Sequence, residues 1–263
     1  SPPRLSVAMM TFNEEANISR ALSSVFWADE VVVLDSGSDD RTREIARAAG
    51  ANVWQEEWRG FGAQRARSLE LCSGLWVLAL DADEAVSPRL AASIRSVVQS
   101  GSTTKHGFEL ERHSFHLGRW FGSRGWHRDR VLRLVRRDQV VPVEKAVHER
   151  IDVAGSVGRL AGPLLHWPYR DLAHHMEKMA AYSDLKARQL RASGRGASPA
   201  SAVARSLWRC VSGYVFEGGF LYGWPGLAAD LLGAHGTLLA YLKLAEYAEG
   251  SERRESSSSV ARP

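Results

Sequence analysis

Five apolar residues, Trp76 to Leu80, run directly into the acidic stretch Asp81-Ala-Asp-Glu84. An apolar run of this length is too short for most helices and is typical of a buried strand. In open parallel sheets, ligands bind at the carboxyl ends of the strands. Asp81 and Asp83 are two residues apart, so their side chains point the same way along an extended backbone. Such carboxylates either suit Mg²⁺ or Mn²⁺ bridged to a phosphate, or are ordinary solvated loop residues.

Strand-like and helix-like segments alternate before and after this stretch, which predicts an α/β fold with a parallel sheet and right-handed crossovers. Strands are predicted at 5–12, 30–34 and 52–56, and helices at about 13–26, 41–49, 62–71 and 88–100. Asn13 is the predicted N-cap of the first helix. Further strands are predicted at 108–112, 131–136, 143–153 and 160–167, followed by a helix at 170–191.

Positive charge is concentrated in one segment of a chain whose formal net charge is +4. Residues 112–137 contain eight arginines and one acid, Asp129. This density favours phosphate, nucleic acid or a membrane surface as partner. No recognised nucleic-acid-binding module accompanies the charge, so we expect no nucleic-acid partner. Some of the arginines, particularly the alternating Arg133 and Arg136, are expected to be solvated strand charges.

The chain carries no visible targeting signal. Its first residues lack the basic and apolar pattern of a signal peptide, and no stretch has about 18 uninterrupted apolar residues. The two cysteines are far apart, which favours a reducing compartment. We therefore expect a cytoplasmic protein. Its aromatic segment 205–247 either rests on the inner face of the membrane or packs as a helical pair on the catalytic domain.

Three polar clusters follow predicted strands at the same edge of the sheet, at 11–15, 35–39 and 81–84. Neither a dinucleotide-binding glycine motif nor a P-loop is present, so metal and side chains must neutralise any bound phosphate. Met10-Thr-Phe-Asn-Glu-Glu, Glu30-Val-Val-Val-Leu-Asp-Ser-Gly-Ser-Asp-Asp-Arg-Thr and Leu80-Asp-Ala-Asp-Glu closely resemble the start of family 2 glycosyltransferases. Val147-His-Glu-Arg, Leu165-His-Trp and Gly-Gly-Phe-Leu-Tyr-Gly (218–223) are similar, less tightly, to the bacterial lipopolysaccharide core β-1,4-glucosyltransferase branch.

The resemblance implies a GT-A fold, a nucleotide-sugar donor, Mg²⁺ or Mn²⁺, and inversion at the anomeric carbon. Metal ligands are then Asp83 and His166, and the catalytic base is Glu149. Alternatively, His166 is a satisfied core or cap residue, Glu149 is a surface residue paired with Arg150 or Arg133, and Glu14 is a charge at a helix start. The nucleotide sugar is expected to contact Thr11, Asn13, Glu14, Asp35, Ser36, Gln64, Arg65, Asp81 and Ala82.

The arginine-rich segment and its tryptophans suit a phosphorylated sugar acceptor, because arginine binds phosphate in bidentate fashion and aromatic rings stack on sugars. The predicted acceptor-binding residues are Arg112, Arg119, Trp120, Trp126, Arg128 and Arg130. Two positions depart from the family pattern. Gln64-Arg65 stands where many relatives carry an Asn, and Tyr222 stands where an acid is expected.

The predicted organisation is a catalytic domain at 1–192, with a donor half to about residue 100 and an acceptor half beyond it. A helical extension at 193–249, which either associates with the membrane or packs on the catalytic domain, and a disordered tail at 250–263 follow. The predicted reaction transfers a hexose, glucose by preference, from a UDP-sugar to a lipid-linked phosphorylated oligosaccharide such as a lipopolysaccharide inner-core heptose. The alternatives are an Asp-nucleophile phosphohydrolase and a non-catalytic membrane-surface protein with the same fold.

Overall fold

The computed structural model describes residues 4–101, 103–122, 129–141 and 151–259. The chain divides into two compact units. The first comprises Ser1–Ser114 and Arg128–Trp167, and the second comprises Phe115–His127 and Pro168–Pro263.

The first unit is built on a mixed sheet with the strand order β3-β2-β1-β4-β8-β6-β9-β5. Four of the seven pairings in this order are parallel: β3-β2, β2-β1, β1-β4 and β6-β9. The strands are β1 (Leu5–Thr11), β2 (Glu30–Asp35), β3 (Asn52–Gln55), β4 (Trp76–Asp81), β5 (Glu84–Val86), β6 (Gly107–His116), β8 (Asp129–Arg136) and β9 (Val157–His166). The α/β fold with a mostly parallel sheet, as predicted, is confirmed.

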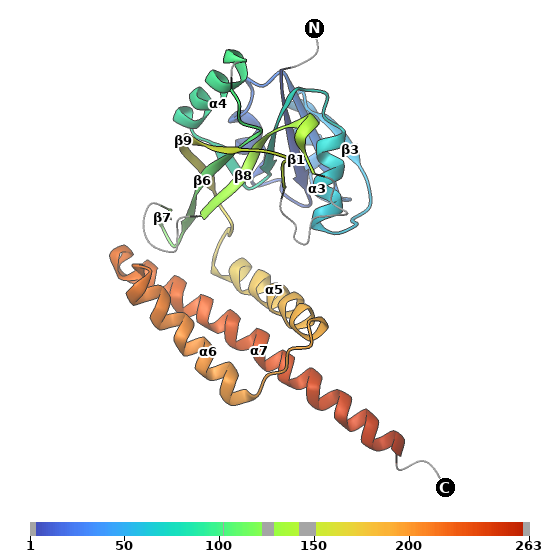
Figure 1. The fold of residues 1–263 in the computed structure, drawn as a ribbon, viewed down its shortest axis with the longest axis vertical. Helices are drawn as coiled ribbons and strands as arrows, with labels where there is room; N and C mark the ends of the chain where they lie inside the picture. Colours follow the sequence, from blue (N-terminus) through green and yellow to red (C-terminus); the bar gives the residue numbers. More distant parts are fainter. Residues whose placement is uncertain (1–3, 102, 123–128, 142–150, 260–263) are drawn as a thin grey trace. The chain divides into compact units, whose positions relative to one another are not determined.

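Helices flank both faces of this sheet because its central strands are apolar on both sides (Figure 1). Along β4, Trp76, Leu78 and Leu80 enter one core while Val77 and Ala79 enter the other. The first core also receives side chains from α1, α2 and α4, and the second receives Leu69 of α3. These helices are α1 (Ile18–Ser23), α2 (Thr42–Ala48), α3 (Phe61–Glu70) and α4 (Pro88–Ser100).

Three local predictions differ from the structure. Helix α1 begins at Ile18 with Asn17 as its N-cap, because the preceding loop is held to the loop after β2 and Asn13 has a φ of 53°. Strand β5 was not predicted, since three residues carry no periodic signal. The strand predicted at 143–153 lies mostly outside the described residues, and Val153 forms an isolated bridge with Val140.

The second unit is mainly helical. Helix α7 (Trp224–Ser259) packs against both α5 (Leu172–Ala192) and α6 (Pro199–Val211). A π-helical turn (Ser212–Phe216) and a 3₁₀ turn (Gly219–Tyr222) connect α6 to α7, and the short strand β7 (Arg119–Phe121) also belongs to this unit. Within the residues that the structure describes, no helix is both long and apolar enough to cross a membrane.

Two helices of this unit lie across boundaries predicted from the sequence, and the predicted domain organisation stays a prediction. Helix α5, within the predicted catalytic domain, groups with α6 and α7. Helix α7 continues to Ser259, past Gly250, the start of the predicted tail. A helix that is already formed extends at low cost, because each added residue gains one hydrogen bond without a new nucleation step.

Candidate active site

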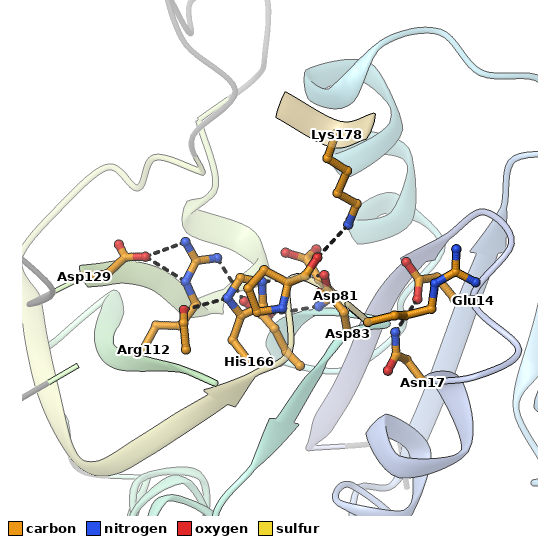
Figure 2. Close-up of polar contacts among 12 residues, drawn as sticks. Glu14, Asn17, Asp81, Asp83, Arg112, Asp129, His166 and Lys178 are labelled. Carbon is orange, nitrogen blue, oxygen red and sulfur yellow. Dashed lines mark hydrogen bonds and ion pairs between the residues drawn. The ribbon is translucent and has the colours of Figure 1, made fainter. Parts of the chain in front are cut away.

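The Asp-x-Asp turn connects β4 to β5 at the carboxyl edge of the parallel strands. Asp81 ends β4 and Glu84 begins β5, which pairs antiparallel with β9 so that Glu84 lies opposite His166. This pairing brings Asp83 and His166 together: Asp83 Oδ2 lies 3.5 Å from His166 Nε2 (Figure 2). The backbone N–H of Trp167 also donates to the Asp83 carbonyl at 2.9 Å. The two predicted metal ligands are therefore neighbours in the fold.

The His166 ring is held by a second contact. Its Nδ1 lies 2.9 Å from Ser114 Oγ, and Ser114 is opposite His166 in the pairing of β6 with β9. When Nδ1 donates to this hydroxyl, Nε2 carries the lone pair and faces the Asp83 carboxylate. This arrangement is typical of metal-binding histidines, in which a hydrogen bond to the other ring nitrogen sets tautomer and orientation.

The Asp83–His166 pair fits a small divalent ion. Metal bonds of about 2.1 Å place adjacent ligand atoms about 3 Å apart, close to the observed separation of 3.5 Å. No group of three or more metal-ligating side chains occurs in the described residues. A bound Mg²⁺ or Mn²⁺ would therefore take its other ligands from phosphate oxygens and water, as Mg²⁺ usually does.

Asp81, the first acid of the motif, is engaged by two arginines. Arg65 Nη2 donates to one carboxylate oxygen and Arg133 Nη2 donates to the other. Burial alone raises the pKa of Asp81, but the nearby charges of Arg133 and Arg65 and their hydrogen bonds outweigh it and hold the pKa well below its usual value. Asp81 is thus a permanent anion that balances two buried cations. Of the two aspartates, Asp83 is the one placed to bind a metal.

Glu84 stabilises the same turn through hydrogen bonds of its carboxylate. It is fully buried, and its Oε2 accepts from the backbone N–H of Asp81 at 3.0 Å. Its Oε1 accepts from Arg133 Nη2 at 2.8 Å and from Arg112 Nη1 at 3.2 Å. Arg112 is also held by Asp129, whose Oδ2 accepts from Nε at 2.7 Å (Figure 2). We call these paired residues the arginine–carboxylate network: Arg65, Arg112, Arg133, Asp81, Glu84 and Asp129.

The network corrects the expectation that Arg133 is a solvated strand charge. Arg133 is buried, and it lies at a register shift of β8: Phe108 pairs with Leu134 and Glu109 with Leu132, so Arg133 falls between two paired residues. The alternation along 131–136 did not reveal this burial, because a register shift depends on the partner strand. Arg112, predicted to bind the acceptor, pairs with Glu84 and Asp129.

The predicted nucleoside end of the site lies where β1 and β2 terminate. Thr11 pairs with Asp35 in register, and its buried Oγ1 has no hydrogen-bond partner among the described residues. An unsatisfied buried hydroxyl is costly, so this atom suits contact with a bound polar ligand. Asp35 is buried and accepts from the backbone N–H groups of Gly37 at 3.2 Å and Ser38 at 3.0 Å.

Other residues predicted to bind the donor brace the surrounding loops. Gln64 is buried and donates to Ser36 Oγ at 3.1 Å. Asn13 Oδ1 accepts from the backbone N–H of Asp39 at 3.0 Å, which ties the β1 and β2 loops together. Glu14 Oε2 accepts from Asn17 Nδ2 at 2.8 Å. Ala82 is buried within the Asp-x-Asp turn.

The remaining predicted residues divide between the units or fall outside the description. Arg130 is exposed on β8 in the first unit. Arg119 and Trp120 belong to the second unit, where Arg119 Nη1 donates to the Tyr222 carbonyl at 2.8 Å. Three predicted residues lie outside the described residues: Glu149, Trp126 and Arg128. Sequence reasoning missed Ser114, because its link to His166 exists only through strand pairing.

Comparisons with known proteins agree with these features. The model of glycosyl transferase family 2 matches residues 6–104. The lipopolysaccharide core biosynthesis glycosyltransferase LpsC of Rhizobium meliloti is 30% identical over 80% of this chain and 85% of its own length. An uncharacterized glycosyltransferase of Rickettsia typhi is 25% identical over 92% of this chain and 87% of its own length.

Among solved structures, glucosyl-3-phosphoglycerate synthase from Mycobacterium tuberculosis, in complex with Mn²⁺, UDP and glucosyl-3-phosphoglycerate, is 29% identical. The match covers 44% of this chain and 45% of that one, with a TM-score of 0.36.

The α/β fold, the acidic turn at the carboxyl edge of its sheet and the relatives together identify a glycosyltransferase. The chain belongs to glycosyltransferase family 2, as its first three motifs predicted.

Proposed function

We propose that the chain is a metal-dependent, inverting hexosyltransferase that moves glucose from UDP-glucose to a lipid-linked, phosphorylated oligosaccharide. The observation that carries this proposal is the 3.5 Å pairing of Asp83 with His166 beside a fully neutralised Asp81. It leaves a defined place for Mg²⁺ or Mn²⁺ at the edge where donor phosphates bind. The relative LpsC supports an acceptor from lipopolysaccharide core biosynthesis, such as an inner-core heptose.

When bound, the metal supplies positive charge to the leaving diphosphate. The residues of the chain hold the reactants: Thr11 and Asp35 are proposed to orient the nucleoside, and Asp83 and His166 to hold the ion. Inversion requires the acceptor hydroxyl oxygen to bond to the anomeric carbon while the bond from that carbon to the phosphate oxygen breaks. The hydroxyl proton passes to a general base, for which we propose Glu149.

The pairing of Asp81 weakens the phosphohydrolase alternative. An Asp-nucleophile phosphohydrolase needs the first acid of its motif to attack phosphorus. Both oxygens of Asp81 accept hydrogen bonds from arginines that are themselves buried. A phospho-aspartate trapped on Asp81 would revive that alternative.

The test is transfer by the purified protein from a panel of UDP-sugars to a lipopolysaccharide core acceptor, with Mn²⁺, with Mg²⁺ and with EDTA. Activity is expected with UDP-glucose plus metal, with NMR of the product giving the inverted anomer. Asp83→Asn should abolish metal-dependent transfer and Glu149→Gln should lower kcat by at least about 100-fold. Asp138→Asn, an exposed acid paired with Arg136, is the matched control. Full activity of Asp83→Asn would refute the metal assignment, and turnover without any UDP-sugar would refute the donor class.

We further propose that the second unit contacts the membrane surface on which a lipid-linked acceptor resides. Large apolar side chains on its connecting turns and adjoining helices are exposed, with Phe216 72%, Trp224 69% and Trp208 64% accessible. Exposed apolar patches of this kind mark interaction sites, and tryptophan favours the membrane–water interface. Arg205, exposed on α6, adds positive charge suited to anionic lipid.

Vesicle flotation tests this contact. The protein should float with vesicles containing phosphatidylglycerol, and Trp208→Ser combined with Phe216→Ser and Trp224→Ser should reduce the bound fraction. Trp54→Ser, which changes an exposed tryptophan of the first unit, is the control. Equal flotation of the triple variant and the wild type would refute the proposed surface.

A further inference from the structure

Arg20 of α1 is a cation beside the Asp-x-Asp turn that the reaction described above does not use. Its Nη2 donates to Asn17 Oδ1 at 2.6 Å, and Asn17 in turn donates to Glu14. Its guanidinium carbon lies 3.7 Å from the centroid of the Trp167 ring. Trp167 is bonded through its backbone to Asp83, so Arg20 is fixed next to the predicted metal-binding residue.

Among the residues that the structure describes, no carboxylate forms an ion pair with Arg20. Burial lowers the pKa of Arg20, while the charges of Asp83 and Glu14 raise it, so both acids are close enough to act on the cation. Neither forms an ion pair with Arg20 within 4.0 Å in the part of the chain that the structure describes. The buried Nε has no hydrogen-bond partner there. An unsatisfied donor at a rigid cation is costly unless a ligand approaches.

The other arginines at this turn are already engaged. Arg65 and Arg133 bind Asp81, and Arg112 binds Glu84 and Asp129. Three arginines balance three carboxylates in the arginine–carboxylate network, so it offers no surplus positive charge. A divalent ion of charge +2 held by the Asp83 carboxylate of charge −1 offsets about one of the roughly three negative charges of a nucleoside diphosphate, so about two remain. A second cation nearby would offset a further charge.

We propose that Arg20, held against Trp167, binds the diphosphate of the nucleotide donor and stabilises it as it leaves. The role rests on the proposed function, because it assigns a further residue to the same donor site. Stacking on the Trp167 ring and the hydrogen bond to Asn17 fix the guanidinium before the ligand arrives, so little side-chain entropy is lost on binding. In this proposal Arg20 contacts the leaving diphosphate, whereas Trp167 is a positioning residue that acts by holding Arg20.

Isothermal titration calorimetry with UDP and with uridine separates a phosphate contact from a general effect on the pocket. Each ligand is titrated in Mn²⁺ and again in EDTA, so that the contribution of the arginine is measured with and without metal. Arg20→Met should weaken UDP binding about 10-fold or more in both buffers and leave uridine binding unchanged, since a hydrogen bond to a charged group has this magnitude. Arg20→Lys should restore part of the loss. Arg41→Met, an exposed arginine paired with Glu44, should bind both ligands as the wild type does.

Trp167→Leu provides a second variant that keeps the cation but removes its support, and it should weaken UDP binding less than Arg20→Met does. If either Arg20→Met or Trp167→Leu weakens UDP and uridine equally, the residues merely shape the pocket and the proposal fails. Wild-type affinity of folded Arg20→Met for UDP also overturns it. If the wild type binds no nucleoside diphosphate at all, the donor assignment under the proposed function fails first, which is a distinguishable result.

Discussion

Removing the Arg133 side-chain charge is the most direct test of the arginine–carboxylate network. Arg133 Nη2 donates both to Asp81 and to Glu84, and Glu84 has no solvent exposure. In Arg133→Met a side chain of similar length remains to fill the space. Both carboxylates then lose a buried cation.

The expected loss of stability depends on the ion pairs that remain in Arg133→Met. Removing one partner of a buried ion pair costs about 3–5 kcal/mol, because the other charge stays buried without compensation. Asp81 keeps Arg65 and Glu84 keeps Arg112, so the expected loss is at the lower end, about 3 kcal/mol. Arg136 on the same strand is the matched control. It pairs with Asp138 at the surface, so Arg136→Met should cost about 0–1 kcal/mol.

Urea unfolding at pH 7, followed by circular dichroism, measures both variants. Adding Glu84→Gln to Arg133→Met should recover part of the loss, since it removes the uncompensated charge. A loss in Arg133→Met no larger than that in Arg136→Met would refute the view that Arg133 is a buried counter-ion.

The same network predicts a dependence on pH. The folded pKa of Asp81 lies below its unfolded value of about 3.9, so its stabilising contribution is complete above that pH and is lost as the pH falls further. In Arg133→Met the pKa of Asp81 should rise towards its usual value. The stability difference between wild type and variant should therefore shrink as the pH falls below about 4.

Three further predictions follow from other sites. Ser114→Ala should raise the Mn²⁺ concentration for half-maximal transfer by about 10-fold or more, because His166 loses its orienting hydrogen bond; Ser93→Ala, which removes a bond to the Ala161 carbonyl, should not. Burial raises the pKa of Asp230 to about 6, so the folded state binds an extra proton and wild-type stability should decline from about pH 4 to pH 7. Asp230→Asn should flatten that decline in thermal melts, and an unchanged slope would contradict the assignment. Gly162 has a φ of 100°, and an added Cβ would lie 2.4 Å from the Leu90 backbone nitrogen, so Gly162→Ala should lower the free energy of unfolding by at least about 2 kcal/mol. Gly50→Ala, at φ 83° in open space, should cost less by the same urea assay, and equal costs would refute the clash.

The alternation of strands and helices was predictable because each element leaves a local signal. The runs at 5–12, 30–34 and 76–80 are apolar throughout, as expected of strands buried on both faces, and all three are strands of the sheet. Short elements were harder to predict from the sequence. Strand β5 exists because it pairs with β9, and a pairing partner cannot be recognised from three residues.

The acidic turn and the threonine at the end of β1 were predicted from residue types at strand ends, whereas the metal-binding role of His166 was predicted from the family resemblance. The sequence did not show which aspartate of the turn, Asp81 or Asp83, pairs with arginine. That choice depends on Arg65 of α3 and Arg133 of β8, which engage Asp81 only when the sheet brings β4 and β8 together. Residue type, spacing and family resemblance therefore predicted which residues the site contains. The tertiary structure determined which charges are already paired, because ion pairing depends on distances between segments that are remote in the chain.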